Sequence, residues 1–226
     1  MAVAVVVLET IKNDTIMNTS EQKIIINVGR QLGSGGHDIG RMLALDFGAN
    51  YYDRELLNLA AKESGLSEKF FEKNDEHKSF LRSFLHLPGG LGASADYSRQ
   101  GFSQDSFFQF QSEAIRKAAM EQSCVFVGRC ADYVLRDMEG VVNVFITASM
   151  DFRIEQVMAK QPFANKQEAR RFIEQGEANR AAYYNYYTGK KWGSAESYDL
   201  CIDSSILGLV ETEKFIAAFI RKRFEL

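Results

Sequence analysis

Residues 24–40 read Ile-Ile-Ile-Asn-Val-Gly-Arg-Gln-Leu-Gly-Ser-Gly-Gly-His-Asp-Ile-Gly, and the architecture can be inferred best from this part of the chain. It starts with an apolar run typical of a buried β-strand, passes through a glycine-rich turn, and continues into a helical pattern. Four glycines fall within the eight residues from Gly29 to Gly36. The segment therefore predicts a strand, a tight turn and a helix in direct succession, the opening unit of an α/β protein.

The turn has the composition of a loop that binds phosphate. Glycine adopts positive φ angles at low cost and lets backbone N–H groups approach an oxyanion, and the following helix adds a partial positive charge. The standard motif is G-x-x-x-x-G-K-[ST], whereas this chain has Gly36 in the lysine position. The predicted cofactor-binding residues are Gly33, Ser34, Gly35, Gly36, His37 and Asp38. The alternative is a plain strand-to-helix turn without a ligand.

Arg30, inside the same loop, is the candidate replacement for the missing lysine. Its guanidinium group is permanently charged and can contact two phosphate oxygens at once, so we predict a catalytic role. The serine or threonine that binds magnesium in the standard motif is also missing. Two alternatives are left for binding magnesium: Asp38 as a ligand, or an ion held by water.

The overall composition excludes several classes of protein. The 226 residues carry a net charge of −3, so no polybasic surface predicts binding to nucleic acid or to an acidic membrane. Three cysteines without a Cys/His cluster favour a reducing compartment, and we predict a cytoplasmic protein without a structural metal. Residues 2–8 are apolar but too few to cross a bilayer. We expect residues 1–22 to be an extension without ordered structure, or residues 1–16 to reflect a misplaced start.

Strand-like runs alternate with helical patterns along the rest of the chain. The predicted strands are residues 24–28, 50–52, 124–127, 141–147 and 200–202. The predicted helices are residues 38–47, 54–64, 105–121, 131–136, 150–160, 166–186 and 209–223. Because several strands are apolar on consecutive residues, we predict a three-layer, doubly wound α/β fold with a parallel sheet of five strands. Residues 23–226 are predicted to form one domain, in which residues 66–104 and 153–197 interrupt the alternation.

Charged residues come directly after two of the predicted strands. Arg129 lies just beyond residues 124–127, and Asp53 and Arg54 lie just beyond residues 50–52. In an open parallel sheet, ligands bind in the crevice outside the carboxyl ends of the strands. We therefore predict that Arg129 reaches a phosphate beside the glycine-rich loop; packing against the carboxyl end of a helix is the alternative.

Four segments, in this order, resemble the cytidylate kinase-like family, which is related to the nucleoside monophosphate kinases. They are residues 29–36, 52–57, 127–133 and 180–192, and the resemblance extends from about residue 23 to the end of the chain. It implies a P-loop NTPase fold that transfers the terminal phosphoryl group of ATP, with Mg²⁺, to a nucleoside monophosphate or a similar small phosphorylated acceptor. It also implies that residues 66–104 are an acceptor-binding insertion and residues 153–197 a mobile lid.

The resemblance further implies roles for individual residues. Asp53, Arg54 and Arg129 would bind the acceptor, and Arg153 and Arg180 in the lid would neutralise charge on the transferred group. The alternative for both lid arginines is a surface ion pair with a neighbouring glutamate. For the whole chain, the alternatives are a nucleotide-sensing module that lost turnover with the lysine, or a kinase of another small metabolite.

Two local patterns predict how the lid segment is built. Asn165, with Glu168 three residues later, has the form of a capping box at the start of a helix. The tyrosine cluster at residues 183–187 has helical spacing, and packing of the lid against the body is favoured over stacking on a base.

Overall fold

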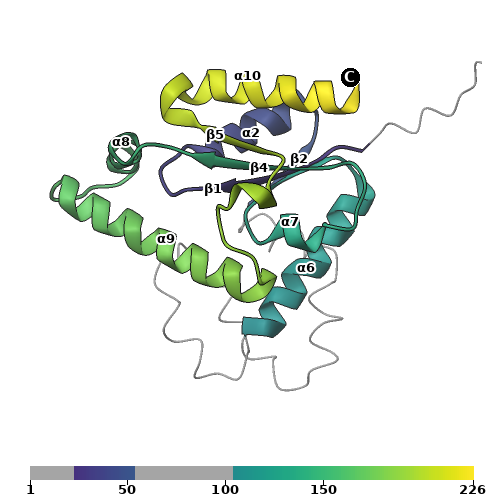
Figure 1. Cartoon of the computed structure of the whole chain (residues 1–226), viewed down its shortest axis with the longest axis horizontal. Coiled ribbons are helices and arrows are strands. Elements are labelled where there is room, and N and C mark those ends of the chain that lie inside the picture. Colours follow the sequence, from purple (N-terminus) through teal and green to yellow (C-terminus); the bar gives the residue numbers. More distant parts are fainter. Residues whose placement is uncertain (1–22, 54–103) are drawn as a thin grey trace, which may run out of the picture.

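The computed structural model describes residues 23–53 and 104–226, which contain one five-stranded parallel sheet. The strand order is β2-β3-β1-β4-β5, so the sheet is doubly wound as predicted (Figure 1). The strands are β1 (Ile25–Arg30), β2 (Asn50–Tyr52), β3 (Cys124–Val127), β4 (Val141–Thr147) and β5 (Leu200–Asp203). Val28 of the central strand β1 pairs with Val127 of β3 on one side and with Val144 of β4 on the other.

Helices cover both faces of this sheet in the described part of the chain. They are α2 (Gly36–Asp46), α6 (Gln104–Glu121), α7 (Ala131–Val134), α8 (Met150–Lys160), α9 (Lys166–Thr188) and α10 (Ser204–Phe224), with a short 3₁₀ helix at Ala195–Ser197. These bounds agree closely with the predicted helices that lie within the described residues. The predicted helix at residues 54–64, the extension at 1–22 and the insertion at 66–104 lie outside them, apart from the last residue of that insertion. The division into domains therefore stays a prediction.

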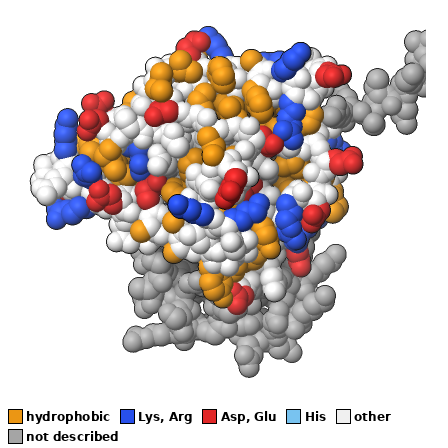
Figure 2. Space-filling view, viewed as in Figure 1, with side chains coloured by type: hydrophobic (Ala, Val, Ile, Leu, Met, Phe, Trp, Pro, Cys, Tyr) orange, Lys and Arg blue, Asp and Glu red, His pale blue; other side chains and the backbone are white. Residues whose placement is uncertain are grey.

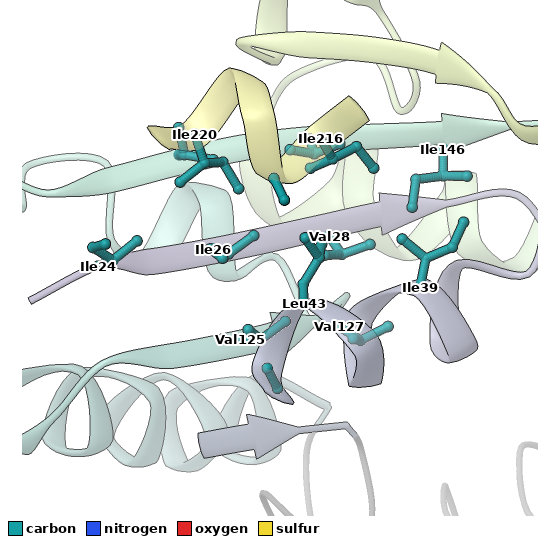
Figure 3. Packing of buried hydrophobic residues seen from close by; sticks show 14 residues of the cluster. Ile24, Ile26, Val28, Ile39, Leu43, Val125, Val127, Ile146, Ile216 and Ile220 are labelled. Atoms are coloured by element: carbon teal, nitrogen blue, oxygen red, sulfur yellow. The ribbon is translucent and has the colours of Figure 1, made fainter. Parts of the chain in front are cut away.

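The core on one face of the sheet lies between the strands and helices α2 and α10 (Figure 3). Side chains alternate along a strand, so Ile26 and Val28 of β1 face these helices while Ile25 faces the other way. Ile39 and Leu43 of α2 and Ile216 of α10 are fully buried against them. The opposite face packs on α6 and α7 through a second buried cluster.

Helices α8 and α9 form a pair to one side of the sheet, with an apolar cluster of their own (Figure 1). Helix α9 starts at the predicted cap, where the Asn165 side chain accepts from the Glu168 amide. The reciprocal bond differs from a standard capping box, because the Glu168 carboxylate accepts from the amide of Ala164, one residue before the N-cap. Near its other end, Tyr187 stacks on Phe108 of α6 with ring centroids 4.2 Å apart. The tyrosine cluster thus packs against the body, as predicted.

Helix α10 contains a kink at Gly208, where φ is 74° and ψ is 170°. The predicted helix at residues 209–223 corresponds to the part beyond this kink. On the face shown in Figure 2, acidic and basic side chains are interspersed, and hydrophobic side chains gather over α10, where Ile206 is 78% exposed. No helix in the described residues has the length and apolar character needed to cross a membrane.

Candidate functional site

The glycine-rich loop joins β1 to α2 and forms one wall of a pocket of about 210 Å³. The opposite wall comes from α8 and α9. The pocket is lined by Arg30, Gln31, Leu32, Gly33, Gly35, Gly36, His37, Gln156, Val157, Lys160, Gln161, Phe172 and Arg180. Four of the six predicted cofactor-binding residues line it, whereas Ser34 is buried and Asp38 lies just beyond.

The loop curls so that several of its backbone N–H groups remain available to a ligand. Gly33 and Gly35 have φ angles of 83° and 76°, a conformation that favours glycine. Among the described residues, the amides of Gly33, Gly35, Gly36 and His37 donate to no protein acceptor. Helix α2 begins at Gly36 without a side-chain cap, so its dipole and its first amides face the same region. This arrangement is suited to an oxyanion.

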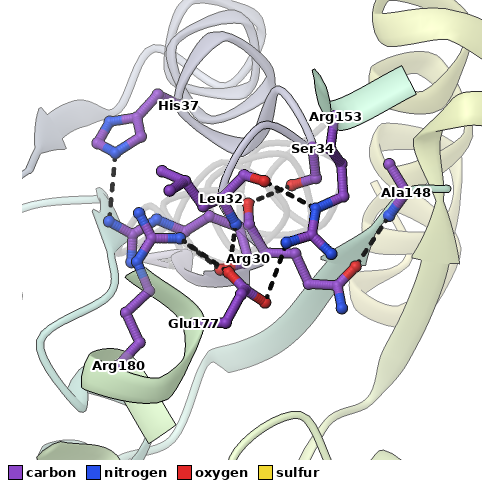
Figure 4. Close-up of polar contacts among 9 residues, drawn as sticks. Arg30, Leu32, Ser34, His37, Ala148, Arg153, Glu177 and Arg180 are labelled. Carbon is purple, nitrogen blue, oxygen red and sulfur yellow. Dashed lines mark hydrogen bonds and ion pairs between the residues drawn. The ribbon is translucent and has the colours of Figure 1, made fainter. Parts of the chain in front are cut away.

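The α8–α9 pair holds the back of the loop at Leu32 (Figure 4). The Leu32 amide donates to Glu177 Oε1 at 2.6 Å, and Arg153 Nε donates to the Leu32 carbonyl oxygen at 2.8 Å. Arg153 and Glu177 also lie 3.4 Å apart as an ion pair. The Leu32 side chain packs against the apolar cluster of the pair, which includes Ile154 and Ile173. The loop and the two helices are therefore joined by both polar and apolar contacts.

Arg30 lies at the carboxyl end of β1. Its side chain passes through the space in which the side chain of a lysine at position 36 would begin. A Cβ atom on Gly36 would lie 2.5 Å from Arg30 Cβ, and one on Gly128 would lie 2.1 Å from Arg30 Nη1. Two glycines thus leave room for this side chain. Its Nε is buried without a hydrogen-bond partner in the described residues, while Nη2 lies 3.2 Å from His37 Nε2.

Two further arginines surround Arg30. Arg180 of α9 donates from Nη1 to the Arg30 carbonyl oxygen at 3.2 Å and lines the pocket. Burial, followed by repulsion from Arg180 and Arg129, lowers the pKa of Arg30 to about 9. Arg30 therefore stays protonated at neutral pH, and the site carries an excess of positive charge that an anion would relieve.

Arg129 lies in a strained turn directly after β3, the neighbour of β1 in the sheet. Gly128, Arg129 and Cys130 have consecutive φ angles of 79°, 61° and 55°. Non-glycine residues adopt this conformation at a cost, and such strain is concentrated at functional sites. The Arg129 guanidinium lies 5.9 Å from the centre of the Tyr183 ring on α9.

Three other predicted site residues, Arg153, Asp38 and Asp53, are not among the residues that line the pocket. Arg153 is only 4% exposed and is held beneath the loop, outside the pocket lining. Asp38 forms an ion pair with Lys160 at 2.6 Å, and Asp53 lies 3.9 Å from Arg41. Arg54 lies outside the described residues.

Sequence reasoning missed several polar contacts in and around the loop. The Gln31 side chain accepts from the Ala148 amide, and the Ser204 hydroxyl donates to the Ser34 carbonyl oxygen. Tyr184 of α9 donates to Asp132 of α7 at 2.6 Å, and burial raises the pKa of that carboxyl group. Asp132 follows Arg129 by three residues, but no local pattern identifies the tyrosine that meets it.

The described residues do not assemble a set of protein ligands for magnesium in this site. The Ser34 hydroxyl donates to the Gln31 carbonyl oxygen, and Asp38 is paired with Lys160. In residues 23–53 and 104–226, no group of three or more His, Cys, Asp or Glu side chains could hold a metal ion. The described residues therefore fit the phosphates of a nucleotide better than they fit a protein-held cation.

The sheet order, the loop between β1 and α2, and the arginines around it define an α/β protein of the P-loop kinase type. The chain belongs to the cytidylate kinase-like family, whose model matches residues 25–206. A search of curated proteins finds no match.

Two solved structures show the same fold. One is an uncharacterized protein from Eubacterium ventriosum ATCC 27560, which is 29% identical, with 88% of this chain and 99% of that chain covered and a TM-score of 0.67. The other is a gluconokinase from Sinorhizobium meliloti 1021, which is 14% identical, with 90% of this chain and 94% of that chain covered and a TM-score of 0.51. At that identity the gluconokinase supports the fold alone.

Proposed function

We propose that this protein is a phosphotransferase that moves the terminal phosphoryl group of ATP to a nucleoside monophosphate or a similar small phosphorylated acceptor. The observation that carries the proposal is the loop with available amides beside Arg30, Arg129 and Arg180. Family membership supports the reaction class. The three cysteines, none of them in a disulfide, are compatible with action in the cytoplasm, which belongs to the same proposal.

The phosphates of ATP would bind to the available amides of Gly33, Gly35, Gly36 and His37 at the start of α2. Arg30 would replace the lysine of the standard phosphate-binding loop, because the first carbons of its side chain lie beside Gly36 and its guanidinium remains charged. The buried Nε of Arg30 has no acceptor among the described residues, and a phosphate oxygen would satisfy it.

Transfer would depend on positioning and on positive charge around the moving group. An oxygen of the acceptor phosphate forms the new bond to the terminal phosphorus while the bond to the ADP oxygen breaks. Arg180 would face the transferred group from α9, and Arg129 would hold the acceptor phosphate. Asp53 and Arg54 would bind other groups of the acceptor. For Arg153 the geometry favours holding the loop through Leu32 over direct contact with phosphate.

Magnesium would bind mainly to nucleotide oxygens and water, as it does at many phosphate sites. It would supply additional charge neutralisation at the phosphates when bound. The roles proposed here for Arg30, Arg129 and Arg180 require only their own charge and hydrogen bonds.

A second candidate is a nucleotide-binding module without turnover. Gly36 in the lysine position is the specific observation that favours it. Such a module would bind the phosphates of a nucleotide at the loop but would not catalyse phosphoryl transfer.

Turnover of ATP with a panel of nucleoside monophosphates separates the two candidates. We expect ADP formation that depends on one acceptor, and Arg30→Ala should lower kcat/KM by roughly 10³-fold. Arg170→Ala is the matched control, because Arg170 lies on α9 with a 57% exposed side chain and forms a surface ion pair with Glu174, away from the pocket lining. Calorimetric ATP binding without transfer to any acceptor would favour the binding module. Near-normal turnover of Arg30→Ala would remove Arg30 from the mechanism.

A further inference from the structure

His37 lies between Arg30 and Tyr51, with one ring nitrogen directed at each. Its Nε2 is 3.2 Å from Arg30 Nη2, and its Nδ1 is 3.1 Å from the Tyr51 hydroxyl oxygen. An arginine side chain has only donors, so Nε2 must accept the hydrogen bond from Arg30. A neutral ring carries one proton, which then resides on Nδ1 and is donated to Tyr51. The contacts therefore select one tautomer of the imidazole.

A charged ring would not fit this position. A proton on Nε2 would face the Arg30 guanidinium, and the ring is also largely removed from water. Burial and the charge of Arg30 lower the pKa of His37 to about 4, Arg180 and Arg41 lower it further, and the negative charge of Asp53 partly opposes the shift. The ring is thus neutral at neutral pH, in agreement with the geometry.

The identity of this partner matters for the charge of Arg30. Within residues 23–53 and 104–226, no carboxylate lies within ion-pair distance of Arg30. A carboxylate would orient the guanidinium but would also cancel its charge. A neutral imidazole orients it and leaves the charge available to phosphate.

We infer that His37 is a positioning residue, a neutral imidazole protonated on Nδ1 and held by Tyr51, which fixes the Arg30 guanidinium at the loop without neutralising it. The inference rests on the proposed function, because it assumes that Arg30 contacts the phosphates of ATP. It assigns the His37 side chain a role through Arg30 rather than direct contact with the ligand.

The tautomer can be measured without any activity. The chain has three histidines, His37, His77 and His86, so the signals missing from the His37→Gln spectrum assign His37. In ¹H–¹⁵N spectra of wild-type side chains at pH 7, we expect Nδ1 to carry the proton and Nε2 to be unprotonated. A ring protonated on Nε2, or a charged ring at this pH, would overturn the inference.

A matched set of variants tests the effect on the ligand. His37→Gln keeps an acceptor near the position of Nε2, and we expect its ATP affinity to stay within about 3-fold of wild type. His37→Leu has no acceptor, and we expect a loss of about 10-fold in ATP affinity and of roughly 100-fold in kcat. Should His37→Leu fail to fold, Tyr51→Phe provides the second variant, because it removes the acceptor for Nδ1–H and should weaken ATP binding in the same direction.

The outcomes separate this inference from the proposed function. The wild-type protein could bind ATP, show the expected tautomer and give the expected ranking of the variants in ATP affinity, yet transfer no phosphoryl group. That result supports the positioning role of His37 and rejects the phosphotransferase. If phosphoryl transfer is normal and His37→Leu equals wild type in ATP affinity and kcat, the positioning role of His37 is rejected. The proposed phosphotransferase function is then unaffected.

Discussion

An alanine at position 36 would place a methyl group into the stem of Arg30. The added Cβ would lie 2.5 Å from Arg30 Cβ and 2.8 Å from Arg30 Cγ, whereas the next atom, Ile146 Cδ1, is 3.7 Å away at ordinary contact distance. Arg30 Cβ is bonded directly to the backbone of β1, so a rotamer change can move Cγ but cannot remove the 2.5 Å overlap with Cβ. Overpacking of this kind costs about 1–3 kcal/mol. Alanine returns at most about 1 kcal/mol through its better helix propensity. We expect Gly36→Ala to lower the free energy of unfolding by about 1–2 kcal/mol.

The sign of this effect should reverse when Arg30 is removed. In an Arg30→Gly background neither conflicting atom is present, so Gly36→Ala should be neutral or should stabilise by up to about 1 kcal/mol. Urea unfolding of the four proteins in this double-mutant cycle gives both values. An equal cost of Gly36→Ala in the two backgrounds, or no cost in wild type, would refute the assignment of the lysine space to Arg30.

Three further predictions concern the supports of the site. Leu32→Ala should lower the free energy of unfolding by about 2 kcal/mol and weaken ATP binding, because Leu32 packs into the α8–α9 cluster. The control is Leu45→Ala, at an 85% exposed position. Equal effects of the two variants in urea unfolding would contradict the packing role of Leu32. Tyr184→Phe should lower the free energy of unfolding by about 1.5–3 kcal/mol, because Asp132 loses its buried hydroxyl donor. Tyr186→Phe, at a 71% exposed position, should change it little. If both variants unfold at the same urea concentration, the Tyr184–Asp132 contact does not contribute to stability. Burial raises the pKa of the Cys130 thiol from 9.0 to about 12, so the unfolded chain loses this proton first as the pH rises. This thiol alone should lower the free energy of unfolding by about 1 kcal/mol between pH 8 and pH 10. Cys130→Ala should reduce the fall measured by urea unfolding across this range by that amount, and an unchanged pH dependence would show that the thiol does not contribute.

Most of the fold could be predicted because its signals are local. Apolar runs and helical periodicity located the strands and helices of the described residues to within a few positions. The predicted first strand ended at Val28, but β1 continues to Arg30, which pairs with Ile146 of β4. That extension depends on a neighbouring strand, so no local pattern could reveal it.

The site was predicted less completely, because its geometry depends on contacts between distant segments. The glycine spacing was enough to predict the loop and its available amides. The resemblance implies a catalytic role for Arg153, whereas in the structure its Nε contacts the carbonyl oxygen of Leu32, 121 residues away in the sequence. The partnership of His37 with Tyr51 likewise joins α2 to β2 through the fold. Neither contact has a counterpart in residue spacing along the chain.

The insertion of Leu32 into the α8–α9 cluster has a consequence for local unfolding. The loop cannot open without withdrawing this side chain, so exchange of amide hydrogens with solvent in the loop and in the facing turns of both helices should share one opening free energy. A nucleotide that binds only the closed loop would slow exchange in all three segments by a common factor. Protection of α8 and α9 would then report occupancy of a loop that precedes them by more than a hundred residues.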